Sequence, residues 1–275
     1  MNELISVVVS TYERPDALAA VLRGLSRQSD RGFEVIIADD GSGAATAAVI
    51  AQWRAKLGVS LTHARQEHCG FRAAEIRNRA IAASRGFYCV FLDGDCIPRA
   101  DFIAQHRCLA DPGWFVAGNR ILLSDEMTGS VLAQGLEPET WDFAALLKHR
   151  RKGINRLAPV LRLPLGILRK AASQRWEGAR TCNLAVARRD LERVDGFDAS
   201  FNGWGLEDSD LAIRLIHAGV RRKDGRFATG VFHLWHREYD RTRLADNQAR
   251  LDDVLRGDRI RALRGLSTLA APAHV

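Results

Sequence analysis

Apolar and polar residues alternate in blocks along the first hundred positions, and these blocks predict strands and helices in turn. Apolar runs of strand length predict strands at 5–10, 33–38, 59–62 and 87–92. Apolar residues at helical spacing predict helices after Pro15, around Trp53 and over 73–84. Strands that alternate with helices indicate an α/β fold with a doubly wound, mainly parallel sheet and right-handed crossovers.

The pattern is less regular beyond residue 98. Apolar pieces at 114–117, 120–123 and 182–187 predict mixed strands. The polar stretch 208–218, with inward leucines, predicts a helix, and the apolar run 227–234 predicts a late strand. Over the last thirty residues arginine alternates with aspartate and leucine, which predicts a solvated helix with a loose end at 270–275.

The composition favours a folded protein of the cytoplasm. A chain of 275 residues that is 47% hydrophobic can build one large α/β domain. No apolar stretch reaches the ~18 residues that suggest a membrane span, and the start of the chain reads as a strand, without a basic leader or cleavage site. The five cysteines are odd in number and lack Cys-x-x-Cys spacing, which argues against a disulfide framework and a zinc site.

The net charge of +7 is concentrated in one segment. Between Asp142 and Glu177 the chain has no acidic residue, and leucines mix with cations over 146–172. Such a stretch can lie on an anionic membrane surface, so we expect peripheral attachment at the inner face of a membrane. The alternative is a solvated basic loop that meets an acidic acceptor.

Two carboxylates follow the apolar run 87–92 directly, in Asp93-Gly94-Asp95. Open α/β sheets bind ligands at the carboxyl ends of their strands, and Mg²⁺ and Mn²⁺ prefer carboxylate oxygens and bridge phosphates. The triplet therefore predicts a metal site that holds a diphosphate, with Asp95 as the metal ligand. Asp93 points differently and suits a ribose hydroxyl. Isolated Asp-x-Asp triplets are nevertheless common.

Two further polar clusters end the first two predicted strands, so we expect them at the same rim. They are Thr11-Tyr12-Glu13 and Asp39-Asp40-Gly41-Ser42. A carboxylate such as Asp39 can accept from a ring N–H of uracil, and Tyr12 can stack on a flat base. The alternative is that Asp40-Gly41 is a turn and Asp39 a helix cap.

A second acidic cluster, Gly203-Trp204-Gly205-Leu206-Glu207-Asp208, opens the helix predicted at 208–218. The glycines let the backbone bring an indole and carboxylates close to a ligand. An aspartate can take the proton from an attacking hydroxyl, and the indole face can support a sugar ring. The alternative is that the acids compensate the helix dipole.

Two histidines close the late strand, and a neutral imidazole could be a further ligand of a metal held by Asp95. Because alternate strand residues face opposite sides, we expect at most one of His233 and His236 to be a ligand, and we favour His236.

Together these motifs resemble family 2 glycosyltransferases of the GT-A fold, over roughly residues 4 to 240. The Gly-Trp-Gly-x-Glu-Asp stretch is similar to the acceptor and catalytic segment of β-1,4-galactosyltransferases and chondroitin-polymerase-type enzymes. The resemblance implies a GT-A domain over 1–240, with a nucleotide-sugar half at 1–98 and an acceptor-binding half at 99–240. Within the second half lies the basic insertion 143–176, and 241–275 would be a helical extension. The segment 124–176 matches no pattern of the family and leaves the acceptor open.

The resemblance also implies roles for single residues. Asp39 would contact uracil, Asp93 the ribose, Asp95 and His236 the metal, and Asp208 would be the base of an inverting displacement. Glu207 would bind acceptor or donor hydroxyls. Near the donor nucleotide the resemblance places Arg72, Arg77 and Asn78, of which the two arginines could pair with phosphate or a base edge.

We thus predict an enzyme that uses a UDP-sugar and Mn²⁺ or Mg²⁺ to glycosylate a hydroxyl of a glycan or lipid-linked acceptor, with galactose or N-acetylgalactosamine favoured. One alternative is a metal-dependent sugar nucleotidyltransferase, but residues 10–14 lack the glycine-rich, lysine-bearing loop that a triphosphate needs. Another is a non-catalytic protein that binds nucleic acid or membrane. The predicted crevice is acidic and would repel a phosphate backbone, so we expect no nucleic-acid partner.

Overall fold

A seven-stranded sheet runs through the centre of the molecule, in the order β3-β2-β1-β4-β8-β6-β9. The computed structural model describes residues 3–156, 161–237 and 241–269. The strands are β1 (Ile5–Thr11), β2 (Phe33–Asp39), β3 (Leu61–Arg65), β4 (Tyr88–Asp93), β6 (Trp114–Ala117), β8 (Leu184–Ala187) and β9 (Arg221–Asp224).

The sheet is mixed, and its N-terminal half is parallel as predicted. β1, β2, β3 and β4 all run in one direction, whereas β8 is antiparallel to both β4 and β6. β6 and β9 are again parallel to each other. The carboxyl ends of the first four strands consequently share one edge, as the sequence interpretation requires.

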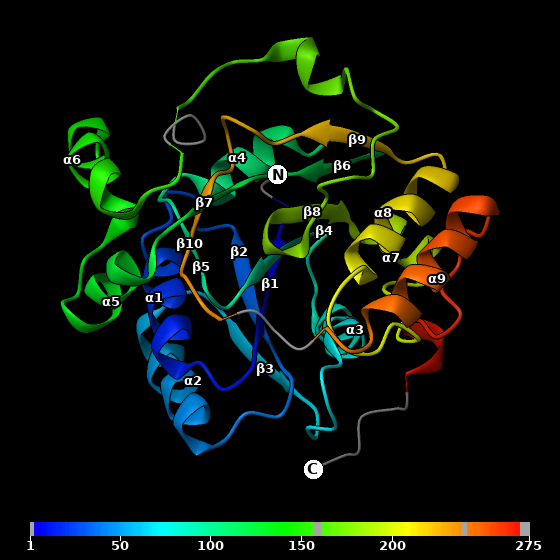
Figure 1. Cartoon of the computed structure of the whole chain (residues 1–275), viewed down its shortest axis with the longest axis horizontal. Helices are drawn as coiled ribbons and strands as arrows, with labels where there is room; N and C mark the ends of the chain where they lie inside the picture. Colours follow the sequence, from blue (N-terminus) through cyan, green and yellow to red (C-terminus); the bar gives the residue numbers. More distant parts are fainter. Residues whose placement is uncertain (1–2, 157–160, 238–240, 270–275) are drawn as a thin grey trace.

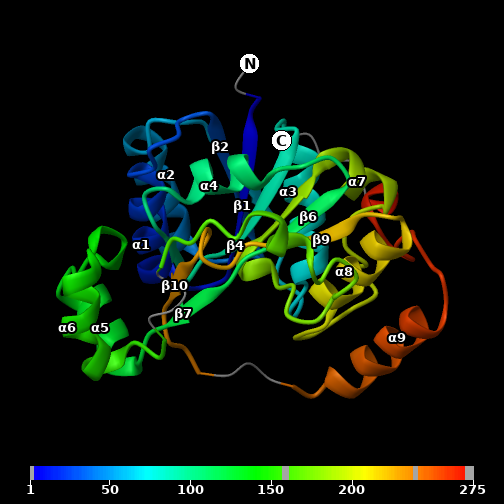
Figure 2. The ribbon, with the colours of Figure 1, turned by 90° about the horizontal axis from the view of Figure 1, so that it is seen from above.

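Helices cover both faces of the sheet (Figures 1 and 2). They are α1 (Pro15–Ser26), α2 (Ala44–Lys56), α3 (Ala73–Ala83), α4 (Phe102–Leu109), α5 (Asp125–Ala133), α6 (Phe143–Gly153), α7 (Arg188–Arg193), α8 (Glu207–His217) and α9 (Leu244–Arg256). Short 3-10 turns lie at Pro138–Thr140 (η1), Gly166–Lys170 (η3), Thr181–Asn183 (η4) and Leu266–Thr268 (η5). No helix among the described residues is long and apolar enough to cross a bilayer.

The strand side chains explain this double layer. Val7 and Val9 of β1 pack into one apolar cluster with α1, while Val8 packs into the other with α3. Successive side chains of a strand point to opposite faces, so a strand that is apolar throughout needs cover on both. The nearly unbroken apolar runs of β1, β2 and β4 therefore dictate the doubly wound arrangement.

A small second sheet, in the order β5-β10-β7, lies next to the end of β4. It contains β5 (Cys96–Pro98), β7 (Arg120–Leu122) and β10 (Val231–His233). β10 is antiparallel to β5, with His233 opposite Cys96. This pairing brings the late strand back to the Asp93-Gly94-Asp95 turn.

Several elements differ from their predicted bounds. β3 begins at Leu61 instead of residue 59, and β10 is shorter than the predicted 227–234 because residues 225–229 form a turn closed by Thr229. The predicted solvated helix, α9, is in fact amphipathic: Leu251 and Val254 are buried against α8. The loose end predicted at 270–275 lies outside the described residues.

Candidate functional site

The register of the sheet brings the three predicted rim loops together. Ser10 of β1 lies opposite Asp93 of β4, and Thr11 lies opposite Asp39 of β2. Thr11, Asp39 and Asp93 are therefore neighbours at one edge, although they are far apart in the sequence. This confirms that the motifs share a rim.

Glu13 joins the first two loops. Its backbone N–H donates to Ser42 Oγ at 3.0 Å, and its carboxylate accepts from the N–H of Gly43 at 2.7 Å. Glu13 has a φ of 48°, in the left-handed region that costs a non-glycine residue energy. Its side chain thus holds the loops in place.

Asp39 is buried and already has protein partners. Its carboxylate accepts from the N–H of Ser42 at 2.8 Å and lies 2.8 Å from His63 Nε2. Burial disfavours the ionised form, but the bonds from His63 and Ser42 outweigh it and keep the pKa of Asp39 below its ordinary value. Asp39 is therefore an anion at neutral pH. Gly43, not Asp39, is the N-cap of α2.

Asp40 closes a turn between the second loop and the start of α3. Its carboxylate accepts from Gln66 Nε2 at 2.6 Å and from the backbone N–H of Arg72 at 2.9 Å. The guanidinium of Arg72 contacts Glu75 at 3.3 Å and also donates to the carbonyl of Glu67. Asp40 therefore fixes the loop that carries Arg72.

A cavity of about 600 Å³ opens between this loop and the Gly203-Trp204-Gly205 turn. Tyr12 stacks on His68 in its wall, with ring centroids 4.2 Å apart. The lining residues are Tyr12, Asp40, His68, Cys69, Gly70, Phe71, Arg72, Asn202, Gly203, Trp204, Thr242 and Arg243. The carboxylates of Asp93, Asp95 and Asp208 do not line this cavity.

Thr11, the last residue of β1, has a buried side-chain hydroxyl at the start of the first loop. Its hydroxyl oxygen is buried and has no hydrogen-bond partner among the described residues. A buried polar atom normally finds a partner, so an orphaned one at a rim indicates a place for a ligand or water.

Asp95 faces two imidazoles. Its carboxylate lies 3.4 Å from His236 Nε2 and 3.7 Å from His233 Nε2. The two rings have centroids 5.2 Å apart. The expectation that the histidines point in different directions is thus wrong. β10 ends at His233, so strand alternation no longer governs His236.

This donor set fits a divalent cation. Ligands bound at ~2.1 Å to one ion lie ~3 Å apart when they are adjacent in its coordination shell. The separations from Asp95 to both imidazoles are close to that value. Burial, despite the nearby Asp95 carboxylate, keeps the pKa of His233 below its ordinary value, so the ring is neutral, as a metal ligand must be.

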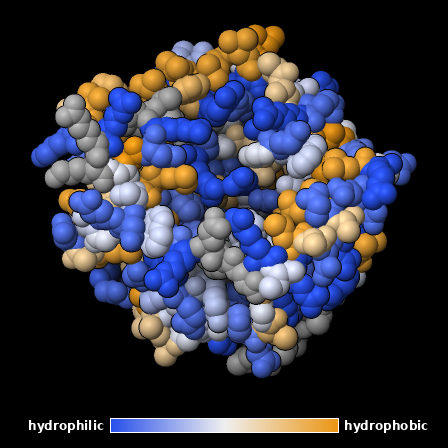
Figure 3. All heavy atoms as spheres, in the orientation of Figure 1, coloured by the Kyte–Doolittle hydropathy of each residue, from blue (hydrophilic) through white to orange (hydrophobic). Residues whose placement is uncertain are grey.

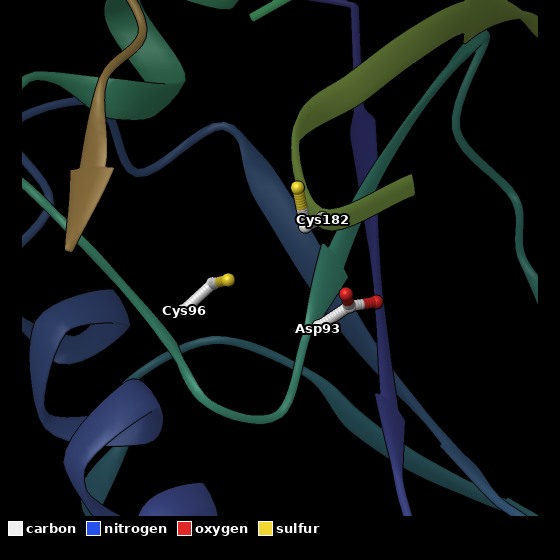
Figure 4. Close-up of side chains that lie close together, drawn as sticks. All are labelled: Asp93, Cys96 and Cys182. Carbon is white, nitrogen blue, oxygen red and sulfur yellow. The ribbon is translucent and has the colours of Figure 1, made fainter. Parts of the chain in front are cut away.

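Cys96 and Cys182 lie beside the acidic turn, close to Asp93 (Figure 4). All five cysteines are free thiols, and these two are buried. Burial, reinforced by the hydrogen bond with Cys182, raises the pKa of Cys96 well above its ordinary value. The Cys96 thiol therefore stays protonated. Both buried cysteines pack as small apolar groups, while Asp95 and the histidines offer the better ligands.

Arg77 joins the two acidic clusters. Its buried guanidinium donates to Glu207 at 2.8 Å, to Asp93 at 3.4 Å and to Ser10 Oγ at 3.0 Å. These contacts place the start of α8 directly beside the end of β4. Arg77 faces protein carboxylates, so the pairing with phosphate that the resemblance implied stays a prediction.

Two carboxyl groups in this cluster have raised pKa values. Burial, opposed by Arg77 and reinforced by Asp95, raises the pKa of Asp93 to about 6. Burial and the neighbouring Glu207 raise the pKa of Asp208 to about 7. Carboxyl groups with pKa values near neutrality concentrate at functional sites, where they exchange protons or meet a cation.

The turn before α8 presents Trp204 at the cavity. Gly205 has a φ of +102° and Leu206 a φ of 77°, so the chain turns sharply into the helix. The guanidinium of Arg241 lies 5.1 Å from the Trp204 ring centroid. Glu207 is buried, and Asp208 is half-buried at the first turn of α8.

Sequence reasoning missed two residues that support the site. His63 bonds to Asp39, and its position in the middle of β3, two residues before the partner of Asp39, could have suggested this. Asn247 of α9 is buried, and its amide donates to the carbonyls of Asn202 at 3.2 Å and Gly205 at 3.0 Å. Nothing in the sequence pattern indicates that a helix forty residues downstream holds this turn.

Two family profiles match the chain. That of glycosyl transferase family 2 covers residues 6–158, and one described as the N-terminal domain of galactosyltransferase covers residues 167–240. Validoxylamine A glucosyltransferase of Streptomyces hygroscopicus is 29% identical over 238 residues, which are 83% of this chain and 55% of that protein. Chondroitin synthase of Escherichia coli is 24% identical over 78% of this chain and 32% of its own length. The chain thus spans about half the length of the first relative and a third of the second.

Two solved structures have a similar fold. The mannosyltransferase PcManGT of Pyrobaculum calidifontis, in complex with GDP-Man and Mn²⁺, superposes with a TM-score of 0.61 at 21% identity, covering 92% of this chain and 64% of that one. S. aureus TarS 1-349 in complex with UDP gives a TM-score of 0.62 at 13% identity, covering 91% of this chain and 65% of that one.

Proposed function

Because the chain belongs to glycosyl transferase family 2 and has the GT-A fold, we propose that it transfers a sugar from a UDP-sugar to an acceptor hydroxyl, with inversion and with a divalent cation. The family establishes a glycosyltransferase. The UDP donor, the inversion and the metal are our proposal.

The observation that carries the proposal is the Asp95 cluster. Its Asp95 carboxylate lies 3.4 Å from one imidazole nitrogen and 3.7 Å from another, at the strand end where such sheets bind nucleotides. Asp95 would hold Mn²⁺ or Mg²⁺ with His236, His233 or both. Bound there, the ion would act as a Lewis acid that neutralises the charge developing on the departing diphosphate.

Asp208 is proposed as the base. With a pKa of about 7 it can accept a proton and is still half ionised at neutral pH. The acceptor oxygen would attack the anomeric carbon while Asp208 takes its proton, and the bond to the UDP oxygen would break on the opposite face. Glu207, held by Arg77, would bind a sugar hydroxyl with its remaining acceptor capacity.

The nucleotide would bind along the rim from Asp93 to Tyr12. We propose that Asp39 accepts from the uracil N–H, that Tyr12 stacks on the base and that Asp93 accepts from the ribose. The unpartnered hydroxyl of Thr11 could donate to the ligand. Gly94 would allow the diphosphate to approach the backbone, and Arg72 would meet its charge.

The acceptor would rest on Trp204, at the Gly205 turn. We propose a glycan or lipid-linked acceptor, because an indole in the cavity wall and a neighbouring base suit a sugar hydroxyl. Galactose or N-acetylgalactosamine remains the favoured donor sugar, in keeping with the galactosyltransferase profile over 167–240. A cytoplasmic location and the absence of a nucleic-acid partner also remain predictions.

The proposal can be tested without knowing the acceptor, because glycosyltransferases hydrolyse their donor slowly. A panel of UDP-sugars, with GDP-mannose as a matched non-UDP donor, is incubated with the protein and Mn²⁺ and scored for released nucleotide. We expect release from at least one UDP-sugar, abolished by EDTA and by Asp95→Asn. Release from GDP-mannose alone would overturn the UDP assignment, and release unaffected by EDTA would overturn the metal.

A further inference from the structure

Exposed apolar side chains gather in one part of the chain. Of the twelve large hydrophobic residues that are exposed among the described residues, half lie between positions 143 and 168. They are Phe143, Leu147, Leu161, Leu163, Ile167 and Leu168. In Figure 3 apolar side chains follow the upper rim of the molecule, where Figure 1 shows the green segment that joins α6 to β8.

The two most prominent side chains are held outward by a fixed turn. Ile167 is 84% exposed and Leu168 is 67% exposed, and both belong to η3. The next residue, Arg169, is buried and donates to the carbonyls of Asp224 and Arg226 at 2.8 and 2.7 Å. The backbone beneath the two side chains is therefore anchored to the body of the protein.

Two other cations fasten the same segment. Arg162 makes a two-pronged ion pair with Asp101 at 2.6 and 2.7 Å, and Lys170 pairs with Asp111 at 2.8 Å. Lys170 also lies over the Trp114 ring, 4.7 Å from its centroid. Arg162, Arg169 and Lys170 thus have a structural role. The sequence pattern predicts a basic stretch that is either solvated or membrane-bound throughout and does not indicate this role.

Two further cations border the exposed apolar side chains of α6. Lys148 and Arg150 are exposed on α6, beside the exposed Phe143 and Leu147, which lie one helical turn apart. The segment between Asp142 and Glu177 contains no acidic residue. We define the apolar-basic surface as the six exposed apolar residues together with Lys148 and Arg150.

We propose that this apolar-basic surface docks the enzyme on a bilayer that contains anionic lipids. Exposed apolar side chains insert at the boundary between headgroups and acyl chains, and neighbouring cations meet the headgroup charge. A second copy of the chain fits poorly, because a two-fold contact would bring cations against cations. An acidic glycan would engage the cations but not Ile167 and Leu168.

The test is co-sedimentation of the full-length protein with vesicles of phosphatidylcholine alone or with a third of phosphatidylglycerol. We expect binding to the anionic vesicles that weakens at 0.5 M salt. Replacing Ile167 and Leu168 by Ser should reduce the partition coefficient about tenfold or more, because the inserted apolar area is lost. The charge reversal of Lys148 and Arg150 to Glu should have an effect of similar size.

Matched controls lie elsewhere on the surface. Leu255 and Leu263 are 42% and 63% exposed, so their replacement by Ser removes exposed apolar area outside the proposed surface. Arg54 and Lys56 of α2 are exposed, and their reversal to Glu changes the net charge equally. Both control pairs should bind vesicles as the unaltered protein does.

Three results would overturn the proposal. The first is failure of the unaltered protein to bind anionic vesicles. The second is equal loss of binding in the surface variants and their controls. The third is a dimer in sedimentation velocity that the Ile167 and Leu168 replacements dissociate, which would assign the surface to self-association. None of these readouts depends on the donor sugar or on catalysis.

Discussion

At the scale of single residues, the proposed chemistry depends on the acids around Arg77. Asp93, Glu207 and Asp208 meet in a poorly solvated cluster with one buried guanidinium, so their negative charge is only partly compensated. The raised pKa of Asp208 is a direct consequence of burial and of Glu207. Such an arrangement suits the base that we propose Asp208 to be near neutral pH, whereas an exposed aspartate would be a far weaker one.

The first prediction concerns Glu207→Gln. Removing the Glu207 charge takes away a cause that raises the Asp208 pKa, so that pKa should fall below about 7. The unaltered enzyme should gain donor-hydrolysis rate as pH rises through about 7, because Asp208 must be ionised. In the variant this acidic limb of the kcat/KM profile should move to lower pH. An unmoved or upward-shifted limb would contradict the assignment.

The second prediction concerns Gly94. A Cβ at this position would lie 2.8 Å from the carbonyl oxygen of Ser10 and 3.2 Å from Thr11 Cβ. Because the backbone of β1 cannot move aside cheaply, Gly94→Ala should displace Asp95 and cost about 1–3 kcal/mol in the free energy of unfolding. Calorimetric titration with Mn²⁺ in the presence of UDP should show weaker binding.

Gly129→Ala is the matched control, since a Cβ at Gly129 of α5 meets no atom within 4 Å. That variant should be neutral or slightly stabilising, as alanine is a better helix former than glycine. Equal effects of the two substitutions would show that the close approach of β1 to Gly94 is unimportant.

At the scale of elements, α9 supports the turn that carries Trp204. Asn247 donates to two carbonyls of that turn, while Gly203 donates to the carbonyl of Phe71 on the cavity's other side. The turn is therefore held between α9 and the loop before α3. Leu206, the N-cap of α8, has a left-handed backbone and makes no side-chain capping bond. The contacts from α9 and from Phe71 therefore help to hold the turn.

The third prediction follows for Asn247→Ala. The loss leaves the part-buried carbonyls of Asn202 and Gly205 with one donor fewer each, which should cost about 1–3 kcal/mol. Hydrogen exchange of a peptide over 201–207 should become about 5- to 150-fold faster, because about 1.4 kcal/mol corresponds to a tenfold change. Gln248→Ala, at the exposed neighbouring position, should leave the exchange unchanged. An unchanged rate in Asn247→Ala would show that α9 does not hold the turn.

Strong local patterns made much of this predictable. The apolar runs of β1, β2 and β4 and the acids directly after them fix both the strands and the shared rim, because parallel strands end at one edge. The approach of both histidines to Asp95 was not predictable, since it depends on β10 ending at His233 and pairing with β5. The burial of Arg77 by Glu207 is also a tertiary contact, 130 residues apart.

At the scale of the whole molecule, the described residues after 240 are tied to α8 and to the loop before it. Arg259 bridges Asp198 at 2.8 Å and Asp210 at 3.2 Å, and both carboxylates are fully buried. Ser267 bonds twice to Asp195, at 2.8 and 2.7 Å. The expected boundary at residue 240 therefore separates parts of one packed unit.

The fourth prediction is that truncation after residue 240 destabilises the protein. Removing Arg259 leaves Asp198 and Asp210 with fewer partners, and unpairing one buried charge typically costs about 3–5 kcal/mol. We expect insoluble protein or a Tm lowered by about 10 °C or more in a melting experiment. Arg259→Ala should produce a part of this loss. A truncated protein with an unchanged Tm would show that 241–275 is dispensable.

The most direct test of the central claim pairs two measurements on Asp208→Asn, namely the rate of UDP-sugar hydrolysis with Mn²⁺ and the affinity for UDP with Mn²⁺. Asparagine keeps the shape of the side chain but cannot take a proton. We predict a hydrolysis rate lower by about 10²-fold or more, as expected for loss of a general base, and an unchanged affinity for UDP. Hydrolysis at the unaltered rate with intact UDP binding would contradict the account.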